Sequence, residues 1–297
     1  MVADLRVELC GIPLRTPLIP AAGTLSRETL GEAADAYGAV LPKTVTPGPR
    51  RGNPPPRVAE VASGMVNSIG LQNPGLEGFL RELGGYEVGL PVFVSVAGDT
   101  VEEFSGLCAR LASEPRVSAV ELNLSCPNVE HGGLTFCAGP ESVERVVAAC
   151  RAALPGTPLF AKLASEGVRE NSLAAEGTGA DALTLVNTIP ALTVDPHRRE
   201  VFLKGGLSGP AIKPVALRSV YEVARLVEVP VIGCGGIASG TDVAEFMLAG
   251  AAAVQVGSSS FVREPGDILS ELSGYLQGAG LSAAALTGSL RDRERVV

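Results

Sequence analysis

The sequence contains very little of what metal-binding proteins use. It has no tryptophan, only two histidines and six cysteines, and the cysteines show neither a CxxC pair nor the Cys/His spacing of a metal site. We therefore expect no metal centre. Most of the cysteines are expected to be small buried hydrophobic side chains, which is the common situation of a free cysteine.

The chain of 297 residues also lacks long apolar runs and an excess of positive charge. No segment approaches the roughly 20 consecutive apolar residues of a membrane span. The first residues, MVADLRVELCG, lack the apolar core of a signal peptide. The net charge of −8, without long runs of like charge, argues against nucleic acid or an anionic membrane surface as a partner. We expect a cytoplasmic protein with neither partner.

What the sequence does contain is a regular alternation of short apolar runs and amphipathic stretches. The runs predict strands at 17–21, 39–44, 91–96, 117–123, 158–163, 180–186, 229–233 and 251–256. The amphipathic stretches predict helices at 28–37, 75–83, 100–112, 140–153, 169–177, 213–228, 239–249 and 264–277. Eight strand–helix units in about 250 residues favour an α/β fold of the closed (β/α)₈ TIM-barrel type, built as one domain over residues 1–297. An open doubly wound sheet is the alternative.

Long insertions interrupt this pattern after the second, fourth and sixth predicted strands. The segments 45–74 and 187–212 are too long to be simple turns, and loops of this length in a compact domain are usually functional. Both leave the C-terminal ends of strands, which form the catalytic face of such a barrel. Residues 5–14 predict a short N-terminal hairpin that caps the opposite end.

Lysine and asparagine are rare and lie near the predicted strand ends. The chain has 20 arginines but only four lysines, and Lys43 and Lys162 end strands while Lys213 begins a helix after a long loop. A lysine supplies a compact charge that the planar arginine fork cannot replace, although a strand-end lysine can also simply extend into solvent. Five of the seven asparagines fall in VNSIGLQNPG, LNLSCPN and LVNT. Amides both donate and accept hydrogen bonds, so together they suit a planar heterocycle, whereas each alone would be a turn former.

Two glycine-rich turns follow the last two predicted strands. GCGGI (233–237) opens a helix after the seventh strand, and VGSSS (256–260) follows the eighth. Backbone N–H groups of such turns bind anions, and the loops after strands seven and eight are the usual phosphate position in these barrels. The pair indicates a phosphorylated substrate or a nucleotide cofactor. Tight turns that need positive φ are the alternative.

Taken in order, the short motifs resemble those of the class 1 dihydroorotate dehydrogenases. They are PAAGT, LPKT, VNSIGLQNPG, ELNLSCPNVEHGG, KL at 162–163, LVNT, GGLSGPAIKP, GCGGI and VGSSS, and they span the whole chain. The resemblance implies a barrel enzyme that contains FMN and oxidises (S)-dihydroorotate to orotate in pyrimidine biosynthesis. VEHGG and GGLSGPAIKPVALR are most like the catalytic subunit of class 1B, which passes electrons to NAD through a partner subunit that carries FAD and an iron–sulfur centre.

The resemblance also implies roles for individual residues. Cys126 would be the base that removes the C5 proton of dihydroorotate while C6 delivers hydride to flavin N5, and a thiol with an unperturbed pKa of about 8.5 suits that role. The loop from Pro127 to about Gly139 would cover the site, and Lys162 would stabilise negative charge near N1 and O2 of reduced flavin. The substrate-binding residues would be Lys43, Asn67, Ser68, Ile69, Gly70, Leu71, Asn123, Asn128, Asn187 and Thr188. The FMN-binding residues would be Ala22, Gly23, Lys43, Thr44, Asn123, Lys162, Val186, Gly209, Gly235, Gly236, Gly257 and Ser258.

Two positions depart from the family pattern. Ser95 stands where the family often has asparagine, which removes an expected flavin contact, and Ala22 stands where serine is commoner, which leaves only a backbone contact. The chain also has no cysteine cluster and no GxGxxG turn between a strand and a helix, so FAD, iron–sulfur and NAD would belong to another chain. We expect a homodimer or a heterotetramer with that electron-transfer subunit.

Other functions remain open on the sequence alone. The alternatives are a class 1A enzyme that uses fumarate directly, a flavin enzyme acting on dihydropyrimidines, a phosphate-binding barrel isomerase or lyase, and a non-catalytic binding module. The last two give no reason for a thiol between substrate-type amides.

Overall fold

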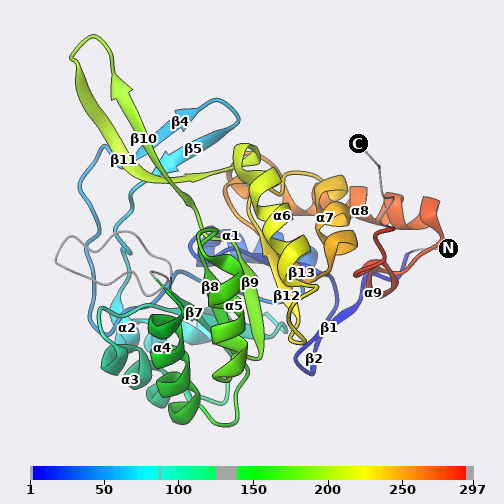
Figure 1. Cartoon of the computed structure of the whole chain (residues 1–297), viewed down its shortest axis with the longest axis horizontal. Helices are drawn as coiled ribbons and strands as arrows, with labels where there is room; N and C mark the ends of the chain where they lie inside the picture. Colours follow the sequence, from blue (N-terminus) through cyan, green and yellow to red (C-terminus); the bar gives the residue numbers. More distant parts are fainter. Residues whose placement is uncertain (1–2, 87, 125–138, 292–297) are drawn as a thin grey trace.

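The computed structural model describes residues 3–86, 88–124 and 139–291, and a curled parallel sheet forms its centre (Figure 1). The sheet has seven strands in the order β3-β13-β12-β9-β8-β7-β6. Every pairing in it is parallel. The strands are β3 (Leu18–Pro20), β6 (Val92–Val96), β7 (Val117–Asn123), β8 (Leu159–Leu163), β9 (Ala182–Leu185), β12 (Val231–Cys234) and β13 (Ala251–Val256).

Residues 38–45 lie between the two edge strands and close the barrel without forming a regular strand. On one side, isolated parallel bridges join Val40 to Val92 and Val45 to Val96 of β6. On the other side, the backbone N–H of Gly38 donates to the carbonyl of Leu18 in β3 at 2.8 Å. Pro42 has no N–H to donate, so the ladder breaks at the middle of the segment. The continuous strand predicted at 39–44 is therefore wrong, although the segment takes the expected place.

The helices follow the strands along the chain and cover the outside of the sheet (Figure 1). They are α1 (Arg27–Ala33), α2 (Gly75–Glu82), α3 (Val101–Leu111), α4 (Pro140–Ala153), α5 (Val168–Gly177), α6 (Lys213–Val223), α7 (Gly240–Ala249), α8 (Pro265–Ala279) and α9 (Ala283–Leu286). The short α9 was not predicted. The helix predicted at 213–228 ends at Val223, because the chain must turn back to β12 and Pro230 cannot continue a helix.

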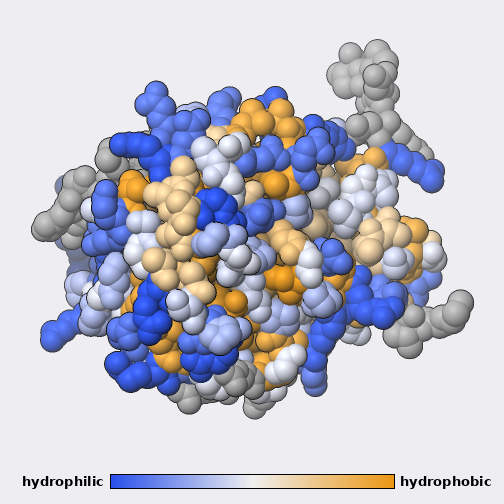
Figure 2. All heavy atoms as spheres, turned by 90° about the horizontal axis from the view of Figure 1, so that it is seen from below, coloured by the Kyte–Doolittle hydropathy of each residue, from blue (hydrophilic) through white to orange (hydrophobic). Residues whose placement is uncertain are grey.

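The strands are buried on both faces, which is why they read as unbroken apolar runs in the sequence. All five residues of β6 and all five of β8 are buried. Phe93 and Phe160 from these two parallel strands pack edge to face, with ring centroids 5.4 Å apart. The helices bury their apolar sides against this sheet. On the face shown in Figure 2, the remaining hydrophobic residues are interspersed with hydrophilic ones.

The insertions after residues 45 and 187 form one antiparallel sheet that lies beyond the C-terminal ends of the barrel strands (Figure 1). Its order is β10-β11-β5-β4, with β4 (Val58–Val61), β5 (Gly64–Asn67), β10 (Ile189–Asp195) and β11 (Glu200–Ser208). β11 pairs with β5 through Gly206 and Asn67. The third predicted insertion, after β7, lies almost wholly outside the described residues.

The N-terminal hairpin lies at the other end of the barrel, as predicted. It consists of β1 (Val7–Leu9) and β2 (Ile12–Leu14), paired antiparallel. The thiol of Cys10 at its turn donates to the carbonyl of Asp181, which precedes β9, at 3.2 Å. Among the helices of the described residues, none is long and apolar enough to cross a membrane.

Candidate active site

A cavity of about 440 Å³ lies where the C-terminal ends of the barrel strands meet the antiparallel sheet. Its volume falls in the range of small-molecule and cofactor sites. Eighteen of the predicted site residues line it: Ala22, Gly23, Lys43, Thr44, Asn67, Ile69, Gly70, Leu71, Asn123, Lys162, Val186, Asn187, Thr188, Gly209, Gly235, Gly236, Gly257 and Ser258. Segments far apart in the sequence therefore converge here, as the barrel prediction requires.

Among the described residues of the predicted site, Ser68 is the one that does not line the cavity. Ser68 is buried behind the cavity wall, where its hydroxyl accepts a hydrogen bond from the amide of Asn53 at 2.9 Å. Cys126 and Asn128 lie outside the described residues, as does most of the loop that begins at Pro127. Their predicted roles stay predictions.

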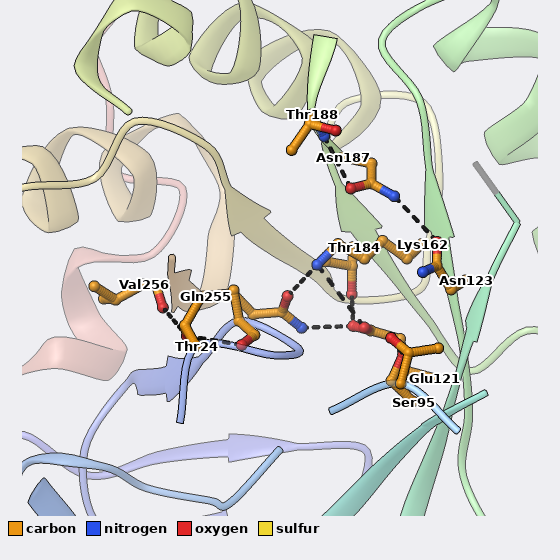
Figure 3. A network of polar contacts seen from close by, with 12 residues as sticks. Thr24, Ser95, Glu121, Asn123, Lys162, Thr184, Asn187, Thr188, Gln255 and Val256 are labelled. Carbon is orange, nitrogen blue, oxygen red and sulfur yellow. Dashed lines mark hydrogen bonds and ion pairs between the residues drawn. The ribbon is translucent and has the colours of Figure 1, made fainter. Parts of the chain in front are cut away.

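Two of the predicted amides contact each other at the ends of β7 and β9. The Nδ2 of Asn187 donates to the Oδ1 of Asn123 at 3.0 Å, and the backbone N–H of Thr188 donates to the Oδ1 of Asn187 at 2.9 Å (Figure 3). These bonds fix both amide planes, so that the NH₂ end of Asn123 is the end turned away from Asn187. Asn67 completes the set from the antiparallel sheet, where its Nδ2 donates to the carbonyl of Gly206 at 3.4 Å. The arrangement suits a planar ligand with its own donors and acceptors.

Lys43 reaches the cavity because Gly23 leaves room for it. A Cβ atom at Gly23 would lie 2.9 Å from both the Cδ and the Nζ of Lys43, and Gly23 has a positive φ of 88°. The motifs PAAGT and LPKT thus meet at one wall. Lys213, by contrast, lies away from the cavity, where its ammonium pairs with Asp242 at 2.6 Å and Glu245 at 2.9 Å. The rarity of lysine was therefore informative for Lys43 and Lys162 but not for Lys213.

Lys162 belongs to a buried polar network at the floor of the cavity (Figure 3). Its Nζ donates to the Oε1 of Gln255 at 2.7 Å, and the Nε2 of Gln255 donates to the Oε2 of Glu121 at 2.5 Å. Thr184 donates to the same carboxylate oxygen at 2.9 Å. The other oxygen of Glu121 lies 3.9 Å from the Nζ of Lys162. The buried ammonium that lines the cavity is thus joined to an amide and a carboxylate that lie behind the lining.

Neighbouring groups keep the side chain of Lys162 protonated. Burial favours the neutral amine and by itself would lower the pKa of Lys162, but the contacts of the ammonium with Cys234 and Glu121 outweigh burial and the pKa is raised. Burial raises the pKa of the Cys234 thiol, which keeps that group neutral near pH 7. The negative charge opposite Lys162 is therefore that of Glu121.

The two glycine turns lie side by side, because β12 and β13 are neighbours in the sheet. Gly236 has a positive φ of 77°, and a Cβ atom there would lie 2.6 Å from the backbone nitrogen of Lys213, so only glycine fits. Gly257 and Ser258 open the turn after β13 and line the same part of the cavity. The positive-φ explanation thus holds for Gly236, and it is compatible with anion binding at the same turn.

Sequence reasoning missed Glu121 and the two residues that donate hydrogen bonds to it across the barrel interior, Thr184 and Gln255. The available signal was a polar residue inside a buried apolar run: Glu121 in VSAVELN and Gln255 in AAAVQV. Ser95, the departure noted above, is explained by its contact. Its hydroxyl lies 3.0 Å from that of Thr44 and is buried behind the lining, so it supports a cavity residue from outside.

These observations define a barrel whose strand ends surround a cavity lined by cationic and amide side chains, an arrangement typical of enzymes with this fold. The sequence model of the dihydroorotate dehydrogenase family matches residues 4–276. The chain belongs to this family. That membership is evidence against the isomerase or lyase and against the non-catalytic module.

Curated relatives indicate which subgroup of the family the chain is most similar to. The protein from Geobacter sulfurreducens named "Dihydroorotate dehydrogenase B (NAD(+)), catalytic subunit" is 44% identical and is matched over 94% of this chain and 95% of its own length. Relatives of the same name from Trichlorobacter lovleyi and Listeria monocytogenes are 46% and 42% identical, over 88% and 94% of this chain and 89% and 95% of their own lengths.

A solved structure confirms the predicted barrel. The crystal structure of DHODH from Eimeria tenella in complex with ferulenol superposes with a TM-score of 0.84. It covers 97% of this chain and 89% of its own, at 24% identity, a level at which the likeness concerns the fold alone.

Proposed function

We propose that this chain is the catalytic subunit of an NAD-linked dihydroorotate dehydrogenase, which oxidises (S)-dihydroorotate to orotate in pyrimidine biosynthesis. The observation that carries the proposal is the convergence of Lys43, Asn67, Asn123 and Asn187 on one cavity above the buried ammonium of Lys162. Dihydroorotate presents a carboxylate and imide groups, which cationic and amide side chains recognise. The names of the relatives point to the same reaction.

FMN is the cofactor that the cavity fits. Lys162 is a charged, buried group of the kind that stabilises negative charge on a flavin, and the turns at Gly236 and Gly257 are suited to a phosphate. When bound, FMN would supply a two-electron acceptor for the hydride that leaves C6 of the substrate. The residues that would hold it are the predicted FMN-binding residues, all of which line the cavity.

The chain's own residues would then orient the substrate and move one proton. Asn123 and Asn187, fixed by their mutual hydrogen bond, would hold the ring edge, and Lys43 would bind the carboxylate. Cys126, three residues beyond Asn123, would accept the C5 proton as a thiolate. The antiparallel sheet and the loop after β7 would exclude water from the reacting carbons.

Electrons would leave through another chain. The relatives are named as the catalytic subunit of an enzyme that uses NAD(+), which implies a separate subunit for electron transfer. We propose that this partner carries FAD and an iron–sulfur centre, because the present sequence has neither a GxGxxG turn between a strand and a helix nor a cysteine cluster.

A spectroscopic experiment tests the function. The purified protein reconstituted with FMN should absorb at about 450 nm, and anaerobic dihydroorotate should bleach that band with formation of one orotate per flavin. Dihydrouracil should not bleach it. A protein that folds but takes up no FMN would contradict the cofactor, and bleaching by dihydrouracil alone would contradict the substrate.

We propose that the exposed hairpin β10–β11 contacts a second copy of this chain. Leu192, Val194, Val201 and Phe202 are about half exposed, and Val194 pairs with Val201. An exposed apolar surface of this kind commonly marks an interface.

We therefore expect Val201→Asp to weaken homodimerisation about a hundredfold or more, because it would place a charge in an apolar contact. Sedimentation velocity over a range of protein concentrations measures the effect. Leu173→Asp, at an exposed apolar position on α5, is the matched control and should leave the dimer intact. An unchanged dimer in Val201→Asp would place the interface elsewhere.

A further inference from the structure

Glu121 is a buried acid whose presence the fold alone does not require. Its side chain is fully buried in β7, and its Oε1 has no hydrogen-bond partner within the described part of the chain. Burying a carboxylate with an unsatisfied oxygen is costly, and apolar side chains of similar volume commonly replace buried ion pairs without loss of stability. The residue therefore calls for a role beyond packing.

The network around Glu121 connects strands that are not neighbours. Glu121 lies on β7, Thr184 on β9 and Gln255 on β13, and β7 and β13 are separated by three strands in the sheet. These side chains meet across the barrel interior, directly below the cavity (Figure 3). Gln255 faces Glu121 with its NH₂ end and Lys162 with its carbonyl end, so one amide joins the carboxylate to the ammonium.

The part of the chain that the structure describes places few titratable groups beside this ammonium. The titratable groups that face Lys162 are Glu121 from β7 and Cys234 from β12, and the thiol of Cys234 is neutral near pH 7 because its pKa is raised by burial. Across the cavity, the additional charged group in its lining is Lys43, which is also cationic. Within the described residues, Glu121 is thus the charged group that opposes the desolvation of Lys162 at neutral pH, beside the contact with Cys234.

We propose that Glu121 is a positioning residue that keeps Lys162 protonated and directed at the cavity, and thereby sets how well the site stabilises negative charge on the flavin. The inference rests on the proposed function in one respect, namely that FMN binds in this cavity. Glu121 acts through Lys162, directly at 3.9 Å and through the bridging Gln255.

The sign of the effect follows from the balance at Lys162. When Glu121 is replaced by glutamine, the desolvation of the ammonium is no longer opposed by the carboxylate, and the pKa of Lys162 falls. The site then keeps its cation at low pH and loses it as the pH rises. Stabilisation of an anionic flavin should therefore become pH-dependent in Glu121→Gln. In the wild type Lys162 stays protonated, so its contribution should not change with pH.

Sulfite is the probe for this property. Its lone pair adds to N5 of oxidised flavin, and the electron pair displaced in the ring becomes negative charge at N1 and O2, with no other product. The dissociation constant of sulfite for Glu121→Gln is divided by that for the wild type at each pH. The ionisation of sulfite itself affects both constants equally and drops out of this ratio. We expect this ratio to rise at least about tenfold between about pH 6.5 and 9.5. Thr184→Val removes a hydrogen bond to Glu121 but keeps the charge, so its ratio to wild type should stay constant with pH.

A ratio that stays constant for Glu121→Gln, in protein that binds FMN, would overturn the proposal. If that variant does not fold, Gln255→Met serves in its place, because it removes the amide that joins Glu121 to Lys162. Its ratio to wild type should also rise with pH, by a smaller factor, and a constant ratio would overturn the proposal as well.

Failure of the proposed function has a different signature. Wild-type protein that takes up no FMN contradicts the cofactor, and wild-type protein that binds sulfite but does not oxidise dihydroorotate contradicts only the substrate.

Discussion

Replacing Cys126 with serine should slow the reduction of bound flavin by dihydroorotate by about two to four orders of magnitude, the usual contribution of a general base. The reason is that a serine hydroxyl releases its proton far less readily than a thiol, so the reactive anion is scarce at neutral pH. FMN binding should persist, because the residues that line the cavity floor are unchanged. Anaerobic stopped-flow absorbance measures the reduction rate in a single turnover.

The same segment supplies a control for this substitution. Cys137→Ser changes a second cysteine of residues 125–138 and should leave the rate within a few-fold of wild type. In the wild type the rate should rise with pH as the thiol ionises, and the rise should be absent from Cys126→Ser. Wild-type reduction rates in Cys126→Ser would remove the assignment of the base.

Lys162→Met should destabilise the folded chain by about 3–5 kcal/mol, because it removes the cation and leaves the carboxylate of Glu121 buried without a counter-charge. The side chains of Lys162 and Glu121 are 7% and 0% exposed, so solvent does not screen the loss. The measurement is the urea midpoint of the protein without added FMN, compared with wild type. FMN affinity should fall in the same variant.

A double substitution separates charge from packing in this prediction. Lys162→Met combined with Glu121→Gln removes both charges, and it should recover most of the stability lost in the single variant while leaving FMN binding weak. If the double variant is as unstable as the sum of both single losses, the two groups do not form an ion pair in solution.

The sequence predicted the barrel well because its strands are buried on both faces. Runs such as PVFVSV and PLFAKL are apolar throughout, so their positions follow from composition, and the helices between them follow from their amphipathic period. The segment 39–44 has the same composition but contains Pro42, and its hydrogen bonds break there. Local propensity could not reveal that this irregular segment would still bond to β3 on one side and to β6 on the other.

The cavity lining was predictable as far as it depends on residues at strand ends. Lys43, Asn123, Lys162 and Asn187 were expected on one face because the C-terminal ends of parallel strands meet there, and all four line the cavity; their binding roles stay predictions. The pairing of β5 with β11 joins residues about 140 positions apart, and no local pattern announces it. The contacts of Glu121 with Thr184 and Gln255 depend on which side chains point to the barrel axis, which the sequence does not state.

The strand β11 carries both the exposed apolar residues and part of the cavity wall. Val201 and Phe202 face solvent, while Gly206 and Ser208, farther along the same strand, line the cavity. Phe202 and Gly206 are separated by about 13 Å of a single extended strand. A second subunit on the hairpin and a pyrimidine in the cavity would therefore act on one rigid element. If ligand binding strengthens the association of the two subunits, thermodynamic linkage requires that association strengthens ligand binding by the same free energy.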